Sequence, residues 1–417
     1  MKEYTLKIIY SILAKFARRV IKRHNPFVIG ITGSVGKSTT KEIIYKVLSD
    51  QFGDQVRKNY GNLNAEIGIP LTILGYTRLP NKLFWPFLLI QAYFRSFVSI
   101  YPKYLILEMG VEHPGDLKYF GTIVRPNLGI ITSTEPVHLV NFADKLALAE
   151  EKISLRNVVK DDGILIVNGD DQNLRKLSGE NITSIGIDSE GTAYRALGIK
   201  IGLDGTEYRI ETLGQKIAIK SKMLGRQFVY ANLFAFAVGQ YFDIQSLEIK
   251  KSLISIKPLP GRMNLIPGLD GMMIIDDTYN ASPAAVKAAI AVLSEIKARR
   301  RVLILGNMNE LGNYEKEAHL EVATFAKSKV DIAIFAGPNA ALMAEKFGEN
   351  AFSFADRTSM QGELKNLLKP HDVILIKASQ NNNYFEEVTK LLMADRSKSA
   401  SLLVRQNAFW LRKKQVK

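Results

Sequence analysis

The residues with the clearest chemistry lie in a glycine-rich segment near the N-terminus. Residues 26–40 read PFVIGITGSVGKSTT, in which a short apolar run precedes the glycines and a helix-forming stretch follows them. A phosphate-binding loop requires this order, because glycines let backbone N–H groups turn toward an anion and a helix start adds the positive end of its dipole. In such a loop Lys37 reaches the terminal phosphates, and the Ser38 hydroxyl joins a Mg²⁺ shell. The segment predicts that the chain binds a nucleoside triphosphate.

Other polar side chains stand at or near the ends of apolar runs. Glu108 ends the run YLILE, and His138 follows the run LGIIT and precedes a helix-like stretch that carries Lys152. Ligands of an open parallel sheet bind at the carboxyl ends of its strands, so Glu108 is expected to complete a Mg²⁺ site with Ser38. A strand-end carboxylate is more often simply solvated, and a single histidine is more often structural than a ligand. Asn232, in YANLFAFA, is a candidate either for reading a base edge or for a helix cap.

These residues need a scaffold of strands and helices, which the apolar pattern supplies. From residue 26 onward, short β-rich runs alternate with helical patterns, as in parallel sheets covered by helices. The alternation within 194–222 predicts instead a small antiparallel region, and a helix is expected near 230–242. The proline-rich stretch KPLPG at 257–261 is the predicted domain boundary. The buried strands expected before it are 104–108, 128–132 and 164–168.

A second alternation follows that boundary and predicts a doubly wound, Rossmann-like domain. Its expected strands are 272–276, 301–305, 331–336 and 372–376, and its expected helices are 284–298, 315–327, 340–347 and 384–393. The fold class is therefore α/β, with a P-loop central domain on a mostly parallel sheet, a C-terminal Rossmann-like domain and an N-terminal amphipathic helix. The predicted domains are 1–25 for that helix, 26–257 for the central domain with an apolar insertion at 83–101, 258–398 for the C-terminal domain, and 399–417 for a basic amphipathic tail.

Composition narrows the classes of partner. A chain of 417 residues is too long for one ordinary core, so two or three domains are expected. It contains no cysteine, which excludes disulfides, thiol catalysis and cysteine metal sites. The formal net charge of +15 points to a polyanionic or phosphorylated partner. The sequence shows no nucleic-acid-binding module, so nucleic acid is not an expected partner.

Two apolar segments also carry basic residues. Residues 1–24 place apolar side chains at three-four spacing on one side and Lys and Arg on the other, which predicts an amphipathic helix. Residues 83–101 repeat the apolar spacing, but Arg95 and Pro86 argue against a full membrane span, since an arginine costs about 2.5–3.5 kcal/mol at a bilayer centre. The two segments are expected either to pack on each other or to lie together in a membrane interface.

Several long motifs together resemble one family, the Mur ligases, which are ATP-dependent amide-forming enzymes of peptidoglycan assembly. The similarity runs over residues 26–390 and is strongest to the branch that adds D-alanyl-D-alanine. The motifs are TGSVGKST in the phosphate loop, GNLNAEIGIPLTIL at 61–74, LEMGVEHPGDL at 107–117, IDDTYNASP at 275–283 and LGNMNELG at 305–312.

The resemblance implies roles for individual residues. Those implied to hold the ATP phosphates are Gly33, Ser34, Gly36, Lys37, Ser38 and Thr39. Those implied to ligate a first Mg²⁺ are Ser38 and Glu108, and those implied to ligate a second are His138 and Lys152. Lys152 can be a ligand because some family members carry a carbamylated lysine at that place, and a carbamate is anionic. By the same resemblance, Asn232 stands where the family has an asparagine that contacts the adenine, and Asp277 stands where it has an aspartate that binds the ribose. Arg262 stands where the family has an arginine that enters the site from the third domain. The implied substrate positions are Asn62 and Asn64 for the acyl substrate and Tyr279, Asn280 and Ser282 for the amine, and the implied catalytic residues are Lys37, His138, Lys152 and Arg262.

The activity implied by the resemblance is amide formation with ATP and Mg²⁺ in peptidoglycan precursor synthesis, and hence in cell-wall biogenesis, cell shape and cell division. A substrate carboxylate attacks the γ-phosphate to give an acyl phosphate, and an amine then displaces phosphate. Because two anions must approach, Lys37 and Mg²⁺ are expected to neutralise the repulsion. The expected partners are a muropeptide-like acceptor and an amino acid or dipeptide, with D-alanyl-D-alanine the leading candidate.

The chain also departs from the family pattern. The usual architecture places a UDP-binding domain before the phosphate strand, where this chain has 25 residues, so that domain is expected to be lacking. Residues 1–23 and 83–101 are expected to supply anchorage instead, for a cytoplasmic enzyme that is peripheral on the inner membrane face or bound to a partner subunit. The expected lack of that domain leaves open whether the acceptor is UDP-linked or lipid-linked. Gln380 stands where the family has an arginine, which leaves the amine substrate open.

Two alternative functions are considered. One is another branch of the same superfamily, such as a folylpolyglutamate-type ligase, against which IDDTYNASP and LGNMNELG argue. The other is a nucleotide-binding membrane scaffold whose catalysis has lapsed. The presence of Lys37, Ser38, Glu108, His138 and Lys152 argues against the scaffold.

Overall fold

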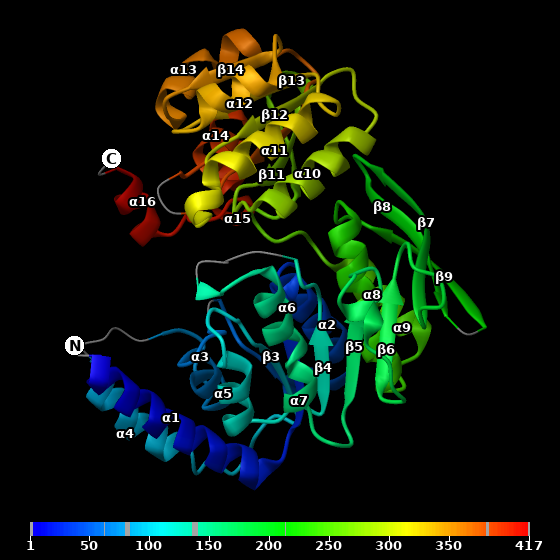
Figure 1. Ribbon diagram of the computed structural model, residues 1–417, viewed down its shortest axis with the longest axis vertical. Helices are drawn as coiled ribbons and strands as arrows, with labels where there is room; N and C mark the ends of the chain where they lie inside the picture. Colours follow the sequence, from blue (N-terminus) through cyan, green and yellow to red (C-terminus); the bar gives the residue numbers. More distant parts are fainter. Residues whose placement is uncertain are drawn as a thin grey trace. The chain divides into compact units, whose positions relative to one another are not determined.

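The chain divides into two compact units in the computed structural model, which describes residues 3–61, 63–79, 84–135, 141–212, 214–380 and 383–415. Figure 1 shows the chain coloured along its sequence. Unit 1 comprises Met1–Leu197, Arg209–Ile219 and Phe228–Ser255, and unit 2 comprises Gly198–Tyr208, Lys220–Gln227 and Ile256–Lys417. The finer domain bounds given above remain a prediction.

The apolar runs near the N-terminus form the centre of a nine-stranded sheet. β1 (Phe27–Thr32) lies between β3 (Tyr104–Glu108) and β4 (Leu128–Ile131) and is parallel to both, so the strand order reverses at β1. From β2 to β7 every pairing is parallel, and the hydrogen-bonded order is β2-β3-β1-β4-β5-β6-β7-β8-β9. The other strands are β2 (Val56–Lys58), β5 (Ile164–Asn168), β6 (Ile182–Gly186), β7 (Tyr194–Gly202), β8 (Gly205–Thr212) and β9 (Gln215–Ser221).

Helices cover these strands because each carries an apolar side that must be buried. In α2 (Lys37–Phe52) the buried apolar residues are Ile43, Ile44, Val47 and Leu48. The other helices up to residue 255 are α1 (Glu3–His24), α3 (Gly68–Ile73), α4 (Trp85–Arg95), α5 (Asp116–Ile123), α6 (Lys145–Ile153), α7 (Leu155–Val158), α8 (Arg226–Tyr241) and α9 (Ser246–Ser255), with short 3₁₀ turns at η1 (Gly53–Gln55) and η4 (Leu174–Lys176).

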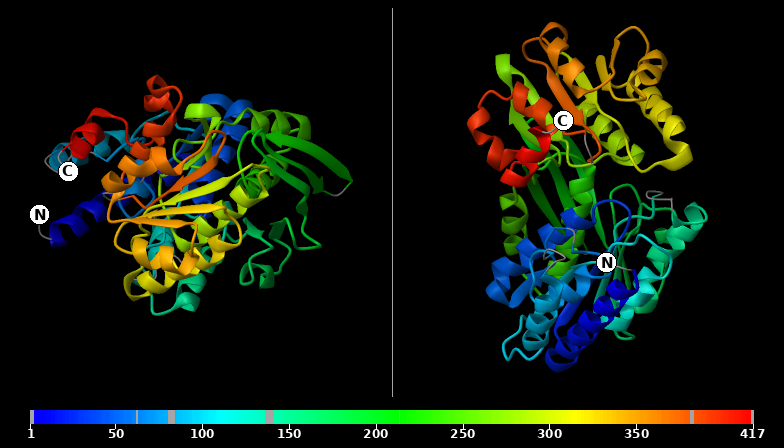
Figure 2. Two further views of the ribbon diagram at one scale, coloured as in Figure 1. Left: turned by 90° about the horizontal axis from the view of Figure 1, so that it is seen from above. Right: turned by 90° about the vertical axis from the view of Figure 1, so that its left-hand side faces the viewer.

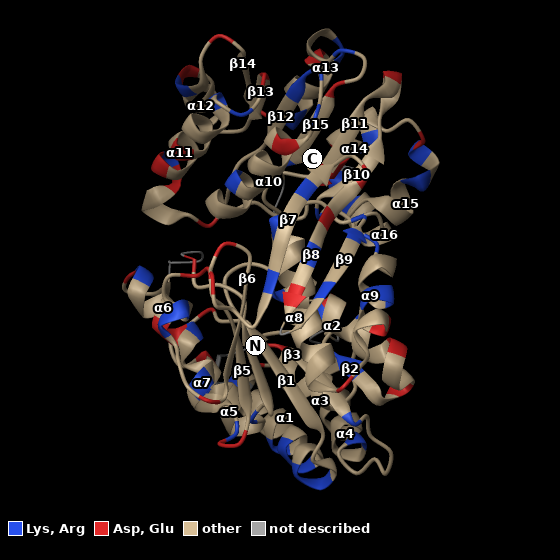
Figure 3. Ribbon diagram, turned by 90° about the vertical axis from the view of Figure 1, so that its right-hand side faces the viewer, with Lys and Arg blue, Asp and Glu red and all other residues tan. Residues whose placement is uncertain are grey.

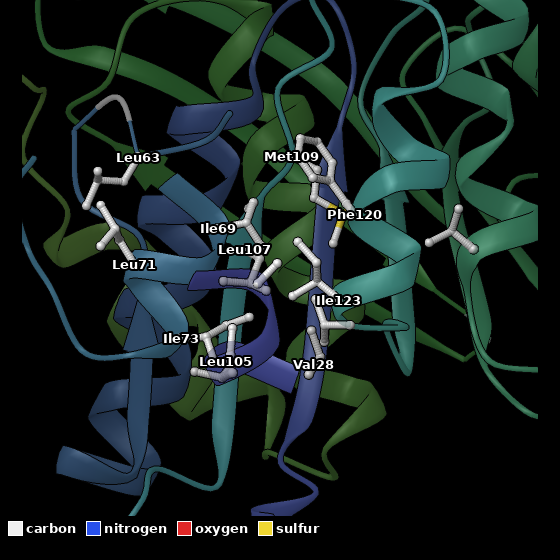
Figure 4. Packing of buried hydrophobic residues seen from close by; sticks show 14 of the residues in the cluster. Val28, Leu63, Ile69, Leu71, Ile73, Leu105, Leu107, Met109, Phe120 and Ile123 are labelled. Carbon is white, nitrogen blue, oxygen red and sulfur yellow. The ribbon is translucent and has the colours of Figure 1, made fainter. Parts of the chain in front are cut away.

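One core cluster of unit 1 lies between the sheet and the helices α1, α3, α4 and α5. Val28, Leu105 and Leu107 point from the strands, and Ile69 and Phe120 point from the helices, into one apolar cluster (Figure 4). Leu13, Ala17 and Val20 of α1 belong to the same cluster, so the N-terminal helix is an integral part of this core.

Unit 2 contains a six-stranded sheet in the order β10-β11-β15-β12-β13-β14, in which only β10 is antiparallel to its neighbour. Helices lie on both faces of this sheet (Figure 2). The strands are β10 (Asn264–Pro267), β11 (Met273–Asp277), β12 (Arg301–Leu305), β13 (Ile332–Ala336), β14 (Ala351–Phe354) and β15 (Val373–Lys377). The helices are α10 (Pro283–Glu295), α11 (Glu315–Lys327), α12 (Ala340–Phe347), α13 (Arg357–Leu367), α14 (Glu386–Leu392), α15 (Ser399–Leu402) and α16 (Ala408–Gln415), with 3₁₀ turns at η5 (Leu269–Gly271), η6 (Gly312–Tyr314) and η7 (Arg396–Lys398).

The predicted α/β fold class is confirmed, and most differences lie at element ends. The helix expected from residue 41 begins at Lys37, because the polar Ser-Thr-Thr run of the phosphate loop hides the first helical turn from a periodicity argument. The helix expected from residue 230 begins at Arg226, which places Asn232 in its second turn rather than at its start. The strand β14 and the helix α13 were not expected.

The two apolar-basic segments pack on each other, which was one of the two expected arrangements. α1 and α4 run side by side (Figure 1), and rings of α1 meet rings of α4 at Tyr10–Trp85 and Phe16–Tyr93, with centroids 6.2 and 5.7 Å apart. The start of the expected 83–101 insertion, at Leu83, lies outside the described residues.

Among the residues that the structure describes, no helix has the length and apolar character needed to cross a membrane.

Candidate active site

The phosphate loop begins where β1 ends and requires glycine. Gly33 and Gly36 have backbone φ angles of +135° and +88°, which residues with a side chain rarely adopt. A Cβ added at Gly33 would lie 2.2 Å from Thr132 Oγ1, so a side chain there would displace the end of β4. The loop leads directly into α2, whose first N–H groups have no partner within the helix and therefore form an anion site.

Lys37 lies folded over this loop. Its Nζ donates hydrogen bonds to the carbonyl oxygens of Gly33 and Ser34, at 2.6 and 3.2 Å. These contacts hold the ammonium in the concave side of the loop, where an anion would meet both the charge and the backbone N–H groups.

Glu108 is the centre of the polar cluster beside the loop. The Ser38 hydroxyl donates to Glu108 Oε1 at 3.0 Å, Asn64 Nδ2 donates to the same oxygen at 3.1 Å, and Lys41 Nζ lies 3.1 Å from Oε2. Burial alone would raise the pKa of Glu108, but the ammonium groups of Lys41 and Lys37 and the hydrogen bonds from Lys41 and Asn64 lower it below its usual value. The side chain is therefore a carboxylate at neutral pH.

The loop around Asn64 is fixed to β3 by a neighbouring amide. Asn59 is fully buried, and its Nδ2 donates to the carbonyl oxygens of Leu63 and Glu108, at 2.9 and 3.0 Å. Its Oδ1 accepts from the N–H of Glu108 at 2.9 Å. The predicted acyl-substrate segment thus lies against the strand that ends in Glu108, while Asn62 lies outside the described residues.

Lys152 is a buried amine in α6. Asp144 caps this helix by accepting from the N–H of Ala147 at 2.8 Å, and Glu151 accepts from the N–H groups of Gly115 and Leu117 at the start of α5, both at 3.0 Å. Burial, and next the charge of Lys37, lower the pKa of Lys152 to about 7. Much of this amine is therefore neutral near physiological pH.

The donor set fits one magnesium ion. Mg²⁺ prefers oxygen ligands, and the Ser38 hydroxyl and the Glu108 carboxylate present two such oxygens at hydrogen-bond distance from each other. A second site is less complete: His138 lies outside the described residues, and a lysine amine binds no Mg²⁺ until it becomes an anionic carbamate. Over the described ranges, no three His, Asp or Glu side chains form a metal cluster by themselves.

Unit 2 carries its own polar cluster at the carboxyl ends of its strands. Asp277 ends β11 and forms an ion pair with Lys377, the last residue of β15, and it also accepts from the N–H of Met263 at 3.2 Å. Lys377 Nζ donates further to the carbonyl oxygen of Asn280 at 2.9 Å. The Arg262 guanidinium lies 4.2 Å from the ring centre of Tyr279. The predicted residues Asp277, Arg262, Tyr279 and Asn280 are therefore gathered, and Ser282 follows as the N-cap of α10.

Several residues of these clusters were missed by the sequence argument. Lys41, Asn59 and Lys377 each bind a predicted site residue, yet none stands within a recognised motif position. The signal for Lys41 is its four-residue spacing from Lys37 on one helix, which places both ammonium groups near Glu108. Asn232 lies fully buried in α8.

The fold and the site together define a class of protein. A parallel sheet whose strand order reverses at β1, with a glycine loop, a lysine and a serine–carboxylate pair at that point, is built to bind a phosphorylated nucleotide.

Comparison with known proteins then narrows that class. Residues 31–85 and 86–239 match the Mur ligase middle domain, and residues 261–380 match the Mur ligase, glutamate ligase domain. The chain is 30% identical over 390 residues to UDP-N-acetylmuramoyl-tripeptide--D-alanyl-D-alanine ligase of Bacillus subtilis (strain 168), covering 91% of this chain and 79% of that protein. The same enzyme of Escherichia coli (strain K12) is 27% identical over 93% of this chain and 80% of its own length.

A solved structure, that of MurF ligase from Thermotoga maritima in complex with ADP, is 26% identical with a TM-score of 0.77, over 94% of this chain and 84% of that one. The chain belongs to the Mur ligase family and is an ATP-dependent ligase of that type.

Proposed function

We propose that this protein joins the amine of D-alanyl-D-alanine, or of a related amino acid or dipeptide, to the peptide carboxylate of a muropeptide acceptor at the expense of ATP. The relatives reported above are named for this reaction on a UDP-linked tripeptide. The observation that carries the proposal is the pairing of an ionised Glu108 with Ser38 beside Lys37 at the point where the strand order reverses.

The residues of unit 1 would prepare the first step. The acceptor carboxylate attacks the γ-phosphorus of ATP, the bond to the β,γ-bridging oxygen breaks, and ADP leaves an acyl phosphate behind. Lys37 would exchange its two loop carbonyls for the phosphate oxygens, so that one ammonium offsets the charge of two approaching anions. The residues proposed to surround the phosphates are Gly33, Ser34, Gly36, Lys37, Ser38 and Thr39.

Magnesium fits this proposal through Ser38 and Glu108, where it would neutralise phosphate charge when bound. Lys41 then keeps Glu108 oriented, because its ammonium holds the second carboxylate oxygen. For a second ion we assign His138 and a carbamylated Lys152. The buried position and low pKa of Lys152 support that assignment, since only a neutral amine reacts with CO₂.

The second step would use residues that the family places around the nucleoside and the amine. We assign Asn232 to the adenine, Asp277 to the ribose and Arg262 to the transferred phosphoryl group. The amine nucleophile would meet Tyr279, Asn280 and Ser282, and the acyl substrate would meet Asn62 and Asn64. The amine attacks the acyl carbon, loses a proton and displaces inorganic phosphate.

We further propose a peripheral position on the cytoplasmic face of the membrane. The support is the pair of segments 1–23 and 83–101, which combine basic residues with exposed apolar side chains. The contact is made either with lipid or with a partner subunit.

Product formation tests the ligase proposal directly. Wild-type protein incubated with ATP, Mg²⁺, a muropeptide acceptor and D-alanyl-D-alanine is expected to yield the amide, detected by mass spectrometry, with one inorganic phosphate per bond. Lys37→Ala is expected to lower turnover by at least about 1,000-fold, as for the loss of a preorganised charge in the transition state. Lys46→Ala is the matched control, because Lys46 lies on the same helix and forms an ion pair with the exposed Asp50.

Turnover that survives Lys37→Ala would refute the phosphate assignment. Wild-type protein that binds ATP but releases neither phosphate nor amide with any acceptor would refute the ligase proposal itself.

A further inference from the structure

The outer side of α4 and the turn after it form an exposed apolar stripe. The side chains of Phe87, Ile90 and Phe94 are 67%, 58% and 68% exposed, and Ile100 beyond the helix is 89% exposed. With Phe84 and Phe97 they recur at a spacing of three or four residues, which puts those within the helix on one side of it. These six residues, Phe84, Phe87, Ile90, Phe94, Phe97 and Ile100, are called the α4 stripe below.

Most of the stripe faces away from the core of unit 1. α4 is attached to unit 1 by its opposite side, where Trp85, Leu88 and Ala92 are buried. Large apolar side chains that are contiguous and exposed on a folded unit mark a surface that meets another apolar phase or partner.

Basic side chains lie immediately beside the stripe. The Arg19 guanidinium of α1 lies 4.6 Å from the ring centre of Phe97, and Arg23 Nη1 donates to the carbonyl oxygen of Phe97 at 3.0 Å. Lys15, Arg18 and Lys22, three to four residues apart, follow along the exposed side of the same helix. In Figure 3 the blue of Lys and Arg appears on the ribbon of α1.

Acidic residues are absent from the surrounding sequence. Residues 4–41 and 67–107 contain no Asp or Glu, whereas the rest of the chain mixes both signs of charge. An apolar stripe bordered by the basic side chains of α1 is complementary to an interface that is apolar inside and anionic at its edge. A bilayer with anionic headgroups has that structure.

We propose that the α4 stripe enters the headgroup–acyl boundary of an anionic phospholipid bilayer, with α1 lying beside it and its basic side chains on the lipid phosphates. α1 and α4 would lie in the plane of the membrane, as amphipathic helices with aromatic residues do. The inference deepens the membrane contact proposed above and is independent of the ligase chemistry. It commits that contact to lipid rather than to a protein subunit.

A second copy of this chain is a poorer occupant. Two stripes that met about a two-fold axis would also bring the basic side chains of two α1 helices together, and like charges repel. The same charges attract an anionic surface.

Binding to vesicles tests the proposal without ATP or any substrate. The wild type is expected to sediment with vesicles of phosphatidylcholine plus phosphatidylglycerol, to bind pure phosphatidylcholine much more weakly, and to dissociate as salt is raised. Lys15→Gln/Lys22→Gln is expected to lower the partition coefficient on anionic vesicles about 30-fold, because each basic residue contributes about fivefold at a charged surface. Phe87→Ser/Phe94→Ser is expected to lower it at least about tenfold.

Matched controls isolate the surface. Leu247→Ser removes an apolar side chain that is also largely exposed, but on α9. Arg175→Gln/Lys176→Gln removes two exposed cations from η4. Neither control is expected to change vesicle binding, and all four variants are expected to keep the wild-type thermal midpoint, since they alter exposed side chains.

Equal sedimentation of the wild type, Lys15→Gln/Lys22→Gln and Phe87→Ser/Phe94→Ser with anionic vesicles would overturn the proposal. So would a dimer in solution that Phe87→Ser/Phe94→Ser dissociates, because the stripe would then be covered by protein. Loss of vesicle binding with unchanged ligase turnover on a water-soluble acceptor would support it and would leave the proposed function untouched.

Discussion

Lys152 is the most unusual ionisable residue of the candidate active site, because a primary amine is 2% exposed and lies near a second ammonium group. An ordinary lysine amine is only about 0.04% neutral at pH 7, given a pKa near 10.4. With a pKa of about 7, Lys152 is neutral about a thousand times more often and can react with CO₂ at physiological pH.

Replacing this amine tests its conversion to a carbamate. Lys152→Ala is expected to reduce ligase turnover by at least about 100-fold, since an anionic ligand would be lost. Acetate or propionate is expected to restore part of the activity, because a small carboxylate fits the space that the side chain leaves. Lys152→Met keeps that space filled and is the control that should not respond. Full activity in Lys152→Ala, measured as phosphate release, would contradict the assignment.

Asp276 in unit 2 is a second buried ionisable group with a consequence for stability. Its Oδ1 accepts hydrogen bonds from the hydroxyls of Thr278 and Thr389, at 2.8 and 2.9 Å, whereas Oδ2 has no partner among the described residues. Burial raises the pKa of Asp276 to about 7, the two hydroxyls oppose the rise, and the charges of Asp277 and Glu386 add to it.

The sign of the pH dependence follows from that raised pKa. Between pH 4 and pH 7 the folded state binds a proton that the unfolded state has released, so unit 2 loses stability as pH rises through about 7. Asp276→Asn keeps the acceptor for both threonines and removes the titration. It is expected to be more stable than the wild type at pH 8, by at most about 4 kcal/mol, and similar at pH 4. Urea unfolding at both pH values measures this, with the exposed Asp270→Asn as control; parallel pH profiles for wild type and Asp276→Asn would contradict it.

The sequence predicted the residues of the site that stand in motifs and missed those that support them. Lys37, Ser38 and Glu108 could be found because a strand end and a glycine loop fix their place along the chain. Lys41 and Asn59 could not, because their function depends on a contact between segments that only the folded sheet brings together.

The C-terminal tail is the element whose part in the fold is least visible in the sequence. Arg405 donates two hydrogen bonds to the fully buried Glu386, at 3.0 and 2.9 Å, and a third to the carbonyl oxygen of Thr278 at 2.7 Å. Lys414 of α16 lies 2.8 Å from the same Glu386 carboxylate. The tail therefore compensates a buried charge and fixes the segment that follows β11.

Removing one partner of that buried pair is expected to destabilise unit 2. Arg405→Met leaves the Glu386 carboxylate with Lys414 alone, and the free energy of unfolding should fall by about 3 kcal/mol. Arg412→Met, on an exposed arginine of α16, is expected to change it by less than about 0.5 kcal/mol. Urea denaturation measures both. Adding Glu386→Gln to Arg405→Met should recover part of the loss, and a failure to recover any would show that packing rather than charge holds the tail.

At the scale of elements, the sequence predicted what has a strong period and missed what does not. Strands β3 and β5 and helices α11 and α12 begin and end at the expected residues, since their apolar positions recur without interruption. α13 carries few apolar side chains, with only Met360 and Leu364 buried, and β14 is partly exposed at the sheet edge. Such elements are specified by their neighbours rather than by their own periodicity.

Each unit has a hydrophobic core of its own among the described residues, and this sets how the molecule should unfold. The cluster around Leu107 and Phe120 belongs to unit 1, and the cluster around Ile304 and Ile374 belongs to unit 2. Chains with separate cores commonly unfold in more than one step. The phosphate loop belongs entirely to unit 1, so a ligand that binds there should stabilise that unit first.

Calorimetry can assign each step to its unit. Leu107→Ala removes a fully buried side chain and is expected to lower the free energy of unfolding of unit 1 alone, by about 2–5 kcal/mol. Arg405→Met should lower the free energy of unfolding of unit 2 alone. ATP with Mg²⁺ at a hundred times its dissociation constant should then stabilise the Leu107-sensitive transition by about 2.7 kcal/mol, and Lys37→Ala should abolish that shift. If ATP instead raised the midpoint temperature of the Arg405-sensitive transition only, the nucleotide would be bound through unit 2, and the proposed function of the phosphate loop would be wrong.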